Sequence, residues 1–182
     1  MTPLLCLLLA GAPDAETLRQ AHLDARLGTR ITGDSIAPFT AVTVEGRTIH
    51  FSKLPHLTRV IAFLEPLASK EGLNRLAWWQ ENHAIFAEAG IDVVLVASDA
   101  PQQGLKLSGL RVIADHKGFL AATFGVLQRR AHGWGASALA FLVDDTGVIR
   151  RVETVAPAAN QGKSLLAGGK VLRRQLLEVH GR

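Results

Sequence analysis

The chain has 182 residues, a formal net charge of +4, 48% hydrophobic residues and 20% charged residues. This length and balance predict one globular domain with a full hydrophobic core. The basic residues are scattered and no basic run is interleaved with aromatic residues, which argues against nucleic-acid binding. No apolar stretch approaches the roughly 20 residues that span a bilayer, so no transmembrane segment is predicted.

The N-terminal 30 residues are predicted to form a leader and a helical arm, and residues 31–182 the domain itself. An apolar run at Leu4–Ala10 is followed by small residues, as in an export signal, but no basic residue precedes it. A cytoplasmic location is therefore favoured, and export is the alternative if Met1–Ala12 acts as a signal segment.

Strand and helix patterns follow one another along the rest of the chain. After an arm helix at about 14–27, the predicted elements are a β-hairpin around Glu45-Gly46, a buried strand at 58–64, a helix from about 73 to Gly90, a buried strand at 91–97, a short strand at 109–115, a helix from about 116 to Gly125, a hairpin of 137–144 and 148–155, and a helix at 163–180. The central strand, helix and strand predict a parallel βαβ unit with a right-handed crossover. The whole order predicts a thioredoxin-like α/β fold, with a mixed sheet covered by helices on both faces.

Cys6 is the only cysteine, so the chain can form no internal disulfide, no CxxC redox motif and no cysteine-based zinc site. The seven histidines include no pair at i, i+4 on one helix and no H-E-x-x-H motif, so no metal site is predicted. No cofactor is predicted either.

Five segments carry a family resemblance. In chain order they are GDSIAPFTAVTVEGRTIHFSKL, RVIAFLEP, GIDVVLVASD, VIADHKGFLAATFGV and ALAFLVDDTGVIRRV, which together cover about residues 31–155. This ordered set resembles the AhpC/TSA peroxiredoxin family of thioredoxin-fold redoxins. The resemblance implies a peroxiredoxin-type fold, in agreement with the fold predicted from the pattern of elements.

The family's chemistry depends on a cysteine at a helix start, seven positions after a proline. Helix N–H groups and an arginine lower the pKa of that thiol, because the thiolate is the group that attacks peroxide. The resemblance aligns Pro66 with the proline, but it aligns Leu73 with the cysteine, Lys70 with the threonine and Ala138 with the arginine. The peroxidatic cysteine is therefore missing, and the resemblance implies a catalytically degenerate member.

The first functional hypothesis is a module that binds a protein or ligand through the former active-site edge. Its candidate residues are Pro66, Lys70, Trp78 and Trp134. Trp78 and Trp79 are adjacent on a helix, so one of them must point away from the core face. Trp134 is flanked by glycines in a predicted loop, and an exposed tryptophan is a common anchor for a partner.

Two alternatives remain open. The chain could be a redoxin-type oxidoreductase with antioxidant activity that uses Cys6 or an unrecognised cofactor. It could also be a structural subunit that pairs with an active relative or with itself.

Leu73 provides a structural expectation of its own. A leucine at this position has no catalytic need for exposure, so we expect it to be largely buried against Leu76 and strand residues 60–63. The former pocket would then be filled, and Leu73→Ala would destabilise the fold by about 2 kcal/mol or more.

Overall fold

The computed structural model describes residues 30–99, 107, 109–130, 133–153 and 158–181, so the predicted leader and arm lie outside the described part. Its centre is a five-stranded mixed sheet in the order β5-β4-β3-β8-β9. The strands are β3 (Thr58–Phe63), β4 (Ile91–Ala97), β5 (Arg111–Ala114), β8 (Ala140–Asp144) and β9 (Ile149–Glu153). Strands β3, β4 and β5 are parallel, whereas β8 and β9 run antiparallel to their neighbours. The predicted fold class is confirmed.

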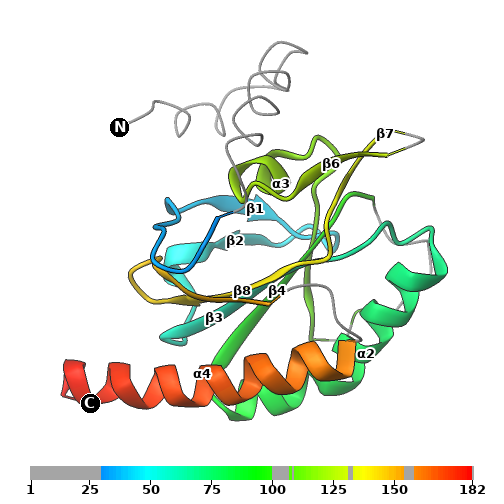
Figure 1. Ribbon diagram of the computed structural model, residues 1–182. Helices are drawn as coiled ribbons and strands as arrows, with labels where there is room; N and C mark the ends of the chain where they lie inside the picture. The colour runs from blue at the N-terminus through cyan, green and yellow to red at the C-terminus, as the bar shows by residue number, and fades with distance from the viewer. Residues whose placement is uncertain (1–29, 100–106, 108, 131–132, 154–157, 182) are drawn as a thin grey trace.

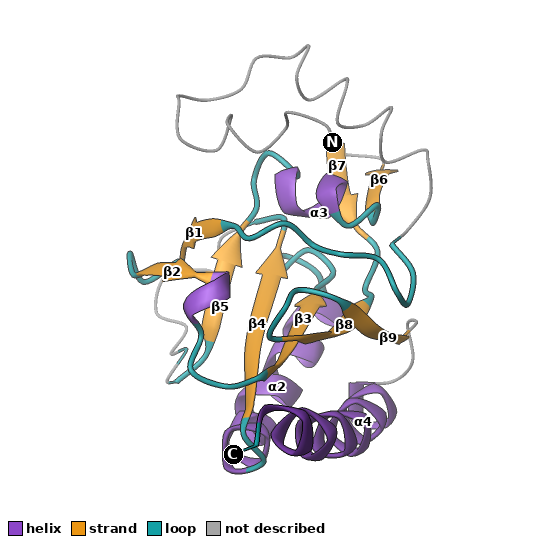
Figure 2. Cartoon of the chain, turned by 90° about the vertical axis from the view of Figure 1, so that its left-hand side faces the viewer, coloured by secondary structure: helices purple, strands orange, loops and turns teal. Residues whose placement is uncertain are grey.

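The two central strands are buried along their whole length, as their continuous apolar sequences predict. Successive side chains of β3 enter different cores: Val60 and Ala62 pack with α2 (Lys70–Glu88) and α4 (Ala158–His180), while Ile61 and Phe63 pack on the opposite face. Figures 1 and 2 show α2 and α4 together on one face of the sheet. The sheet is therefore the middle of three layers.

The opposite face is covered by smaller elements (Figure 2). They are the hairpin β1 (Thr40–Val42) and β2 (Thr48–His50), the 3-10 helix η2 (Phe51–Lys53), the short helix α3 (Phe119–Thr123), and the hairpin β6 (Leu127–Arg130) and β7 (Gly133–Ala136). The first hairpin turns at Gly46 with φ +80°, as predicted.

The observed elements differ from the predicted ones in three places. Helix α2 begins at Lys70, three residues before the predicted start, because Ser69 caps it. Helix α4 begins at Ala158 and not at about 163. The hairpin β6-β7 was not predicted, and Trp134 lies on β7, paired with Arg129, and not in a loop. Its glycine-rich sequence resembles a loop, and only strand pairing makes it regular.

The adjacent Gly168 and Gly169 interrupt the apolar face of α4, but they have different surroundings. A Cβ on Gly168 would lie 3.4 Å from Leu142 Cδ2 and 3.5 Å from Arg151 Cδ, which are ordinary contacts. A Cβ on Gly169 would overlap Ile91 Cδ1. Gly169 therefore permits the close approach of α4 to the sheet, whereas Gly168 leaves room beside the helix.

We expect Gly168→Ala to stabilise the fold by about 0.5–1 kcal/mol, because alanine favours the helix and fits the available space. Gly169→Ala should instead destabilise it by about 1–3 kcal/mol, because Ile91 must shift. Urea unfolding of the two variants measures both effects. Equal changes in the free energy of unfolding would contradict the assigned packing.

Asp144 organises the turn between β8 and β9. Its fully buried carboxylate accepts hydrogen bonds from Thr146 N (3.0 Å), Thr146 Oγ1 (2.7 Å), Val148 N (2.9 Å) and Arg150 Nε (2.7 Å). Burial alone would raise the pKa of Asp144, but the hydrogen bonds from Thr146 and Val148 and the charge of Arg150 lower it below its ordinary value. The ionised carboxylate is therefore the form that stabilises the turn.

We expect Asp144→Asn to reduce the free energy of unfolding by about 2–3 kcal/mol at neutral pH, because charge-assisted hydrogen bonds are lost. A lowered folded-state pKa contributes stability above the unfolded-state value of about 3.9, and that stability is lost as pH falls through the folded-state pKa. The difference between wild type and variant should thus shrink below about pH 4. A difference that stays constant from neutral pH into this acidic range would contradict the role of the charge.

Candidate functional site

The segment between β3 and α2 carries the positions that the family resemblance assigns to catalysis. Strand β3 ends at Phe63, and the chain passes through Pro66 to the cap at Ser69. Ser69 Oγ accepts a hydrogen bond from Gly72 N (3.0 Å) and donates one to Pro66 O (2.7 Å). Ser69 N also donates to Pro66 O (2.8 Å), so this short loop is closed by its own hydrogen bonds.

Asp99, which follows β4, fixes the same loop from the side. Its Oδ1 accepts a hydrogen bond from Leu67 N (2.7 Å) and its Oδ2 accepts one from Ala68 N (2.9 Å). One carboxylate therefore satisfies two consecutive backbone N–H groups. The end of β4 thus positions the segment that leads into α2.

Arg75 and Glu65 form a bidentate ion pair at the base of α2. Arg75 Nε lies 2.8 Å from Glu65 Oε2, and Arg75 Nη2 lies 3.1 Å from Glu65 Oε1. The arginine is buried and the glutamate mostly buried. A guanidinium is thus present two residues after Leu73, but its charge is compensated by Glu65.

Gly72 determines which face of α2 meets the sheet. A Cβ at this position would overlap Pro66 O and would lie 2.7 Å from Glu65 O, and backbone atoms cannot move aside as a flexible side chain can. The helix therefore rests directly on the chain at residues 65–66. One and two turns further, Leu76 and Trp79 continue this buried face.

Leu73 lies outside this face, so its predicted burial is wrong. It is 38% exposed, whereas Leu76 is 1% exposed. Each residue of a helix is turned by about 100° from its predecessor. Because Gly72 faces inward, Leu73 is turned toward solvent, and the former pocket is not filled by its side chain.

The other aligned positions gather at the same edge. Lys70 opens α2 and is exposed, and Pro66 lies in the loop before it. Ala138 is buried just before β8, where Phe63 N donates to Leu139 O (2.8 Å). All four positions therefore lie near the carboxyl end of β3, and a methyl group stands where the resemblance implies an arginine.

The candidate tryptophans lie on two different elements. Trp78 is half-buried in the middle of α2 and approaches α4 so closely that a Cβ on Gly162 would overlap its ring. It also contacts the fully buried Trp79 edge to face, with ring centroids 5.0 Å apart. Much of Trp78 is therefore used in joining the two helices. Trp134 lies on a different element, β7.

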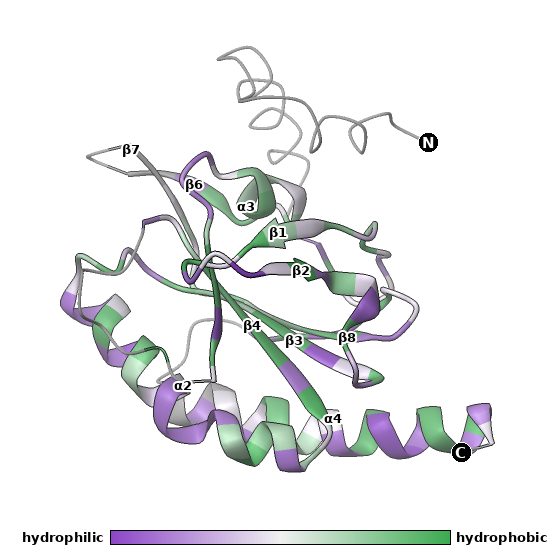
Figure 3. Ribbon diagram, turned by 180° about the vertical axis from the view of Figure 1, so that it is seen from behind, coloured by the Kyte–Doolittle hydropathy of each residue, from purple (hydrophilic) through white to green (hydrophobic). Residues whose placement is uncertain are grey.

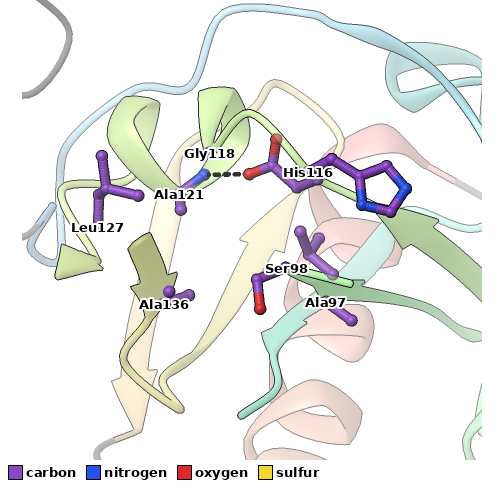
Figure 4. Close-up of a pocket in the computed structure, with 10 residues that line it drawn as sticks. Ala97, Ser98, His116, Gly118, Ala121, Leu127 and Ala136 are labelled. Atoms are coloured by element: carbon purple, nitrogen blue, oxygen red, sulfur yellow. Dashed lines mark hydrogen bonds between the residues drawn. The ribbon is translucent and has the colours of Figure 1, made fainter. Parts of the chain in front are cut away.

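A small cavity lies at the carboxyl ends of β4 and β5, next to α3 and β7 (Figure 4). It has about 10 Å³, which is room for one water molecule, and Ser98, Asp115 and His116 are among its lining residues. These residue types occur in nucleophilic triads, but Asp115 Oδ2 accepts a hydrogen bond from Ala121 N (2.9 Å). Figure 4 shows the imidazole of His116 directed away from Ala121.

Burial raises the pKa of Asp115, although backbone N–H groups of α3, foremost that of Ala121, oppose this shift. The carboxylate of Asp115 therefore stabilises the start of α3. Ser98, His116 and Asp115 do not form a catalytic triad in this cavity. Within the described ranges, no three potential metal ligands cluster. Nor is any helix of these ranges long and apolar enough to cross a membrane.

Sequence reasoning missed Ser69, Asp99 and the pair of Glu65 with Arg75. A cap could have been read from the serine three residues before Gly72. The pairing of Asp99 with the loop and of Glu65 with Arg75 depends on how β4 and α2 are placed, which no local pattern encodes.

We expect Leu73→Ala to change the free energy of unfolding by less than about 1 kcal/mol, because the side chain is exposed. The matched variant Leu76→Ala, one turn away on the buried face, should cost about 2–5 kcal/mol. Chemical denaturation of both variants checks this contrast. A loss above 2 kcal/mol for Leu73→Ala would instead support the filled pocket.

Known proteins share the fold of this chain. No family model and no curated protein sequence matches the chain. Solved structures do: BcpB of Mycobacterium tuberculosis has a TM-score of 0.69 and 20% identity, with 79% of this chain and 98% of that chain covered. AhpC of Enterococcus faecalis has a TM-score of 0.64 and 20% identity, covering 84% and 97%. Peroxiredoxin Q of Xanthomonas campestris has a TM-score of 0.62 and 17% identity, covering 77% and 99%. The chain therefore has a thioredoxin-like fold of the peroxiredoxin type.

Proposed function

We propose that this chain is a catalytically degenerate peroxiredoxin-like protein that binds a protein or ligand partner at the carboxyl end of β3. The observation that carries the proposal is Leu73, an exposed leucine seven residues after Pro66. At this position the peroxiredoxin resemblance requires a thiol, and a leucine side chain cannot ionise at any pH.

Among the described residues around Leu73, the aligned positions supply no substitute nucleophile. Lys70 has no hydroxyl group to orient a peroxide, and Ala138 has no charge to stabilise an anion. The nearby guanidinium of Arg75 is held by Glu65 in a bidentate pair. Without a thiolate, the site has no anion for a cation to stabilise. The loss of the thiol therefore accounts for the loss of the threonine hydroxyl and the arginine guanidinium as well.

The framework around the position is nevertheless kept rigid. Ser69 caps α2 and Asp99 fixes the preceding loop, so Leu73 and Lys70 are presented on a fixed backbone. An apolar side chain and a cation presented on a fixed backbone suit recognition of a partner, because little backbone entropy is lost on binding. Of the candidate residues, Pro66 and Lys70 therefore support the proposal best, together with the exposed Leu73.

A redoxin-type oxidoreductase that uses Cys6 is the alternative activity. Cys6 lies outside the described residues, so the geometry around it carries no argument for or against this role. Mass spectrometry after peroxide treatment separates the two functions. Sulfenylated Cys6, or a disulfide-linked dimer through it, would support the oxidoreductase, whereas an unmodified thiol supports the binding protein.

We expect no peroxide consumption above the rate of free thiol reductant, and no change with Cys6→Ser. Leu73→Cys should restore a thiol but little peroxidase activity, because Lys70 and Ala138 still lack the hydroxyl and the guanidinium that the resemblance implies. A coupled peroxide assay measures both. Turnover that survives Cys6→Ser, or fast reduction by Leu73→Cys alone, would sink the proposal.

The binding role is tested by affinity capture from the native source with the intact chain. Leu73→Glu should abolish recovery of the partner. Ile85→Glu is the matched control, because Ile85 is a similarly exposed apolar residue of α2, at 45% against 38%. Equal loss with both variants, or with neither, would contradict a site at Leu73, and recovery of a catalytically intact relative would favour the structural-subunit alternative.

A further inference from the structure

A second surface lies on α4, away from the start of α2. We propose that the groove between β9 and the C-terminal half of α4 binds an acidic amphipathic helix of a protein partner. Figure 1 shows this part of α4 at the end of the molecule opposite the first turns of α2. The proposal stands independently of the function proposed for Leu73.

The groove has a volume of about 580 Å³. Ten residues line it, among them Leu142, Arg150, Arg151, Gly168, Val171 and Val179. Leu142 and Leu172 are buried and form part of the hydrophobic core. The small residues Ala167 and Gly168 leave the space between helix and strand open.

Exposed apolar side chains line the helix side of the groove. Val171 is 48% exposed and Val179 is 80% exposed, and they are two of the six large hydrophobic residues exposed in the described part of the chain. Eight residues apart, they are separated by about 12 Å along the helix axis. Figure 3 shows the hydrophobic and hydrophilic bands that alternate along this half of α4. A helix laid alongside could contact both valines with apolar residues two turns apart.

The charged residues of the groove are all basic. Arg150 and Arg151 are about half exposed, and none of the ten lining residues is acidic. Their partners lie deeper: Asp144 is 1% exposed and Glu153 is 19% exposed. The carboxylates hold the guanidinium groups in place and partly compensate their charge, but the outer side of each half-exposed guanidinium faces solvent, where it can meet a partner's carboxylate.

The walls of the groove are tied together. Arg151 Nη2 donates to Ser164 Oγ (2.8 Å), and Ser164 Oγ donates to Glu153 Oε1 (2.7 Å), which connects β9 to α4. Near the far end, His180 Nε2 lies 3.2 Å from Asp145 Oδ2. The groove is therefore preformed, which lowers the entropic cost of binding.

Charge and shape select the occupant. Helix α4 carries the lysines and arginines Lys163, Lys170, Arg173 and Arg174, His180 in its last turn, and Glu178 as its one acidic residue. A second copy would bring the same basic helix and the same two arginines, so like charges would meet. A lipid surface is flat and cannot fill a hollow between a helix and a strand. A carboxylate-rich helix with an apolar stripe satisfies both the charge and the hollow.

The test uses a fluorescein-labelled amphipathic peptide of about 18 residues, long enough for about 27 Å of helix, with a leucine stripe flanked by glutamates. Fluorescence anisotropy with the full chain should give a Kd in the micromolar range. The same peptide with glutamine for glutamate should bind at least about tenfold more weakly. Val171→Glu and Val179→Glu should each weaken binding of the glutamate peptide by about tenfold or more.

Two matched variants locate the site. Ile85→Glu makes the same chemical change on α2, and Leu73→Glu changes the surface of the proposed function, and both should leave peptide binding unchanged. Thermal unfolding by circular dichroism checks that each variant folds. If Val171→Glu destabilises the chain, the more exposed Val179→Glu decides alone.

The proposal is overturned if the glutamine peptide binds as tightly as the glutamate peptide, if neither valine variant weakens binding, or if no peptide binds. Sedimentation showing a dimer that Val171→Glu dissociates would assign the groove to a second copy. Binding to vesicles with phosphatidylglycerol, but not to the peptide, would assign it to a membrane surface. If Leu73→Glu alone abolished peptide binding, the peptide would bind at the site proposed around Leu73 and not in the groove. Failure to capture a partner through Leu73 would not affect the groove proposal.

Discussion

The close approach of Gly72 to the backbone at residues 65–66 fixes the rotation of α2, and the rest of the site follows from that rotation. No side chain fits between this helix position and the carbonyl groups of Glu65 and Pro66. With Gly72 inward, Leu76 and Trp79 enter the core and Leu73 must face solvent. A single residue without a side chain thus determines that the position aligned with a catalytic thiol lies on the surface.

Hydrogen bonds around this contact hold the position without making it reactive. Ser69 caps the helix, Asp99 accepts from two consecutive amides of the loop, and Arg75 is paired with Glu65. In a thiol peroxidase, helix N–H groups and a cation serve to stabilise a thiolate. Here Ser69 accepts a hydrogen bond from one helix N–H group, Glu65 pairs with the guanidinium, and Asp99 holds the loop before the helix.

The central strands were predictable because β3 and β4 are continuous apolar runs, and the hairpin at Gly46 was predictable from its turn residues. The exposure of Leu73 was not, because apolar spacing fits a helix with Leu73 inside as well as one with Gly72 inside. Only the contact with residues 65–66 decides between them. In the same way, the place of Trp78 depends on Gly162, which lies 84 residues further along the chain. Local patterns define elements, whereas these contacts arise when the elements pack.

Glycines also explain why α4 serves two purposes. Gly162 admits Trp78 and Gly169 admits Ile91, so one face of the helix lies close to α2 and the sheet. Gly168, turned toward Leu142 and Arg151, fills nothing, and the space that it leaves becomes part of the groove beside β9. Helix α4 packs onto the core along one side and is separated from the edge strand β9 along another. A groove with fixed walls therefore remains between α4 and β9. The arginines at that groove are already oriented by the carboxylates of Asp144 and Glu153, so a partner's charge can engage them without first ordering them.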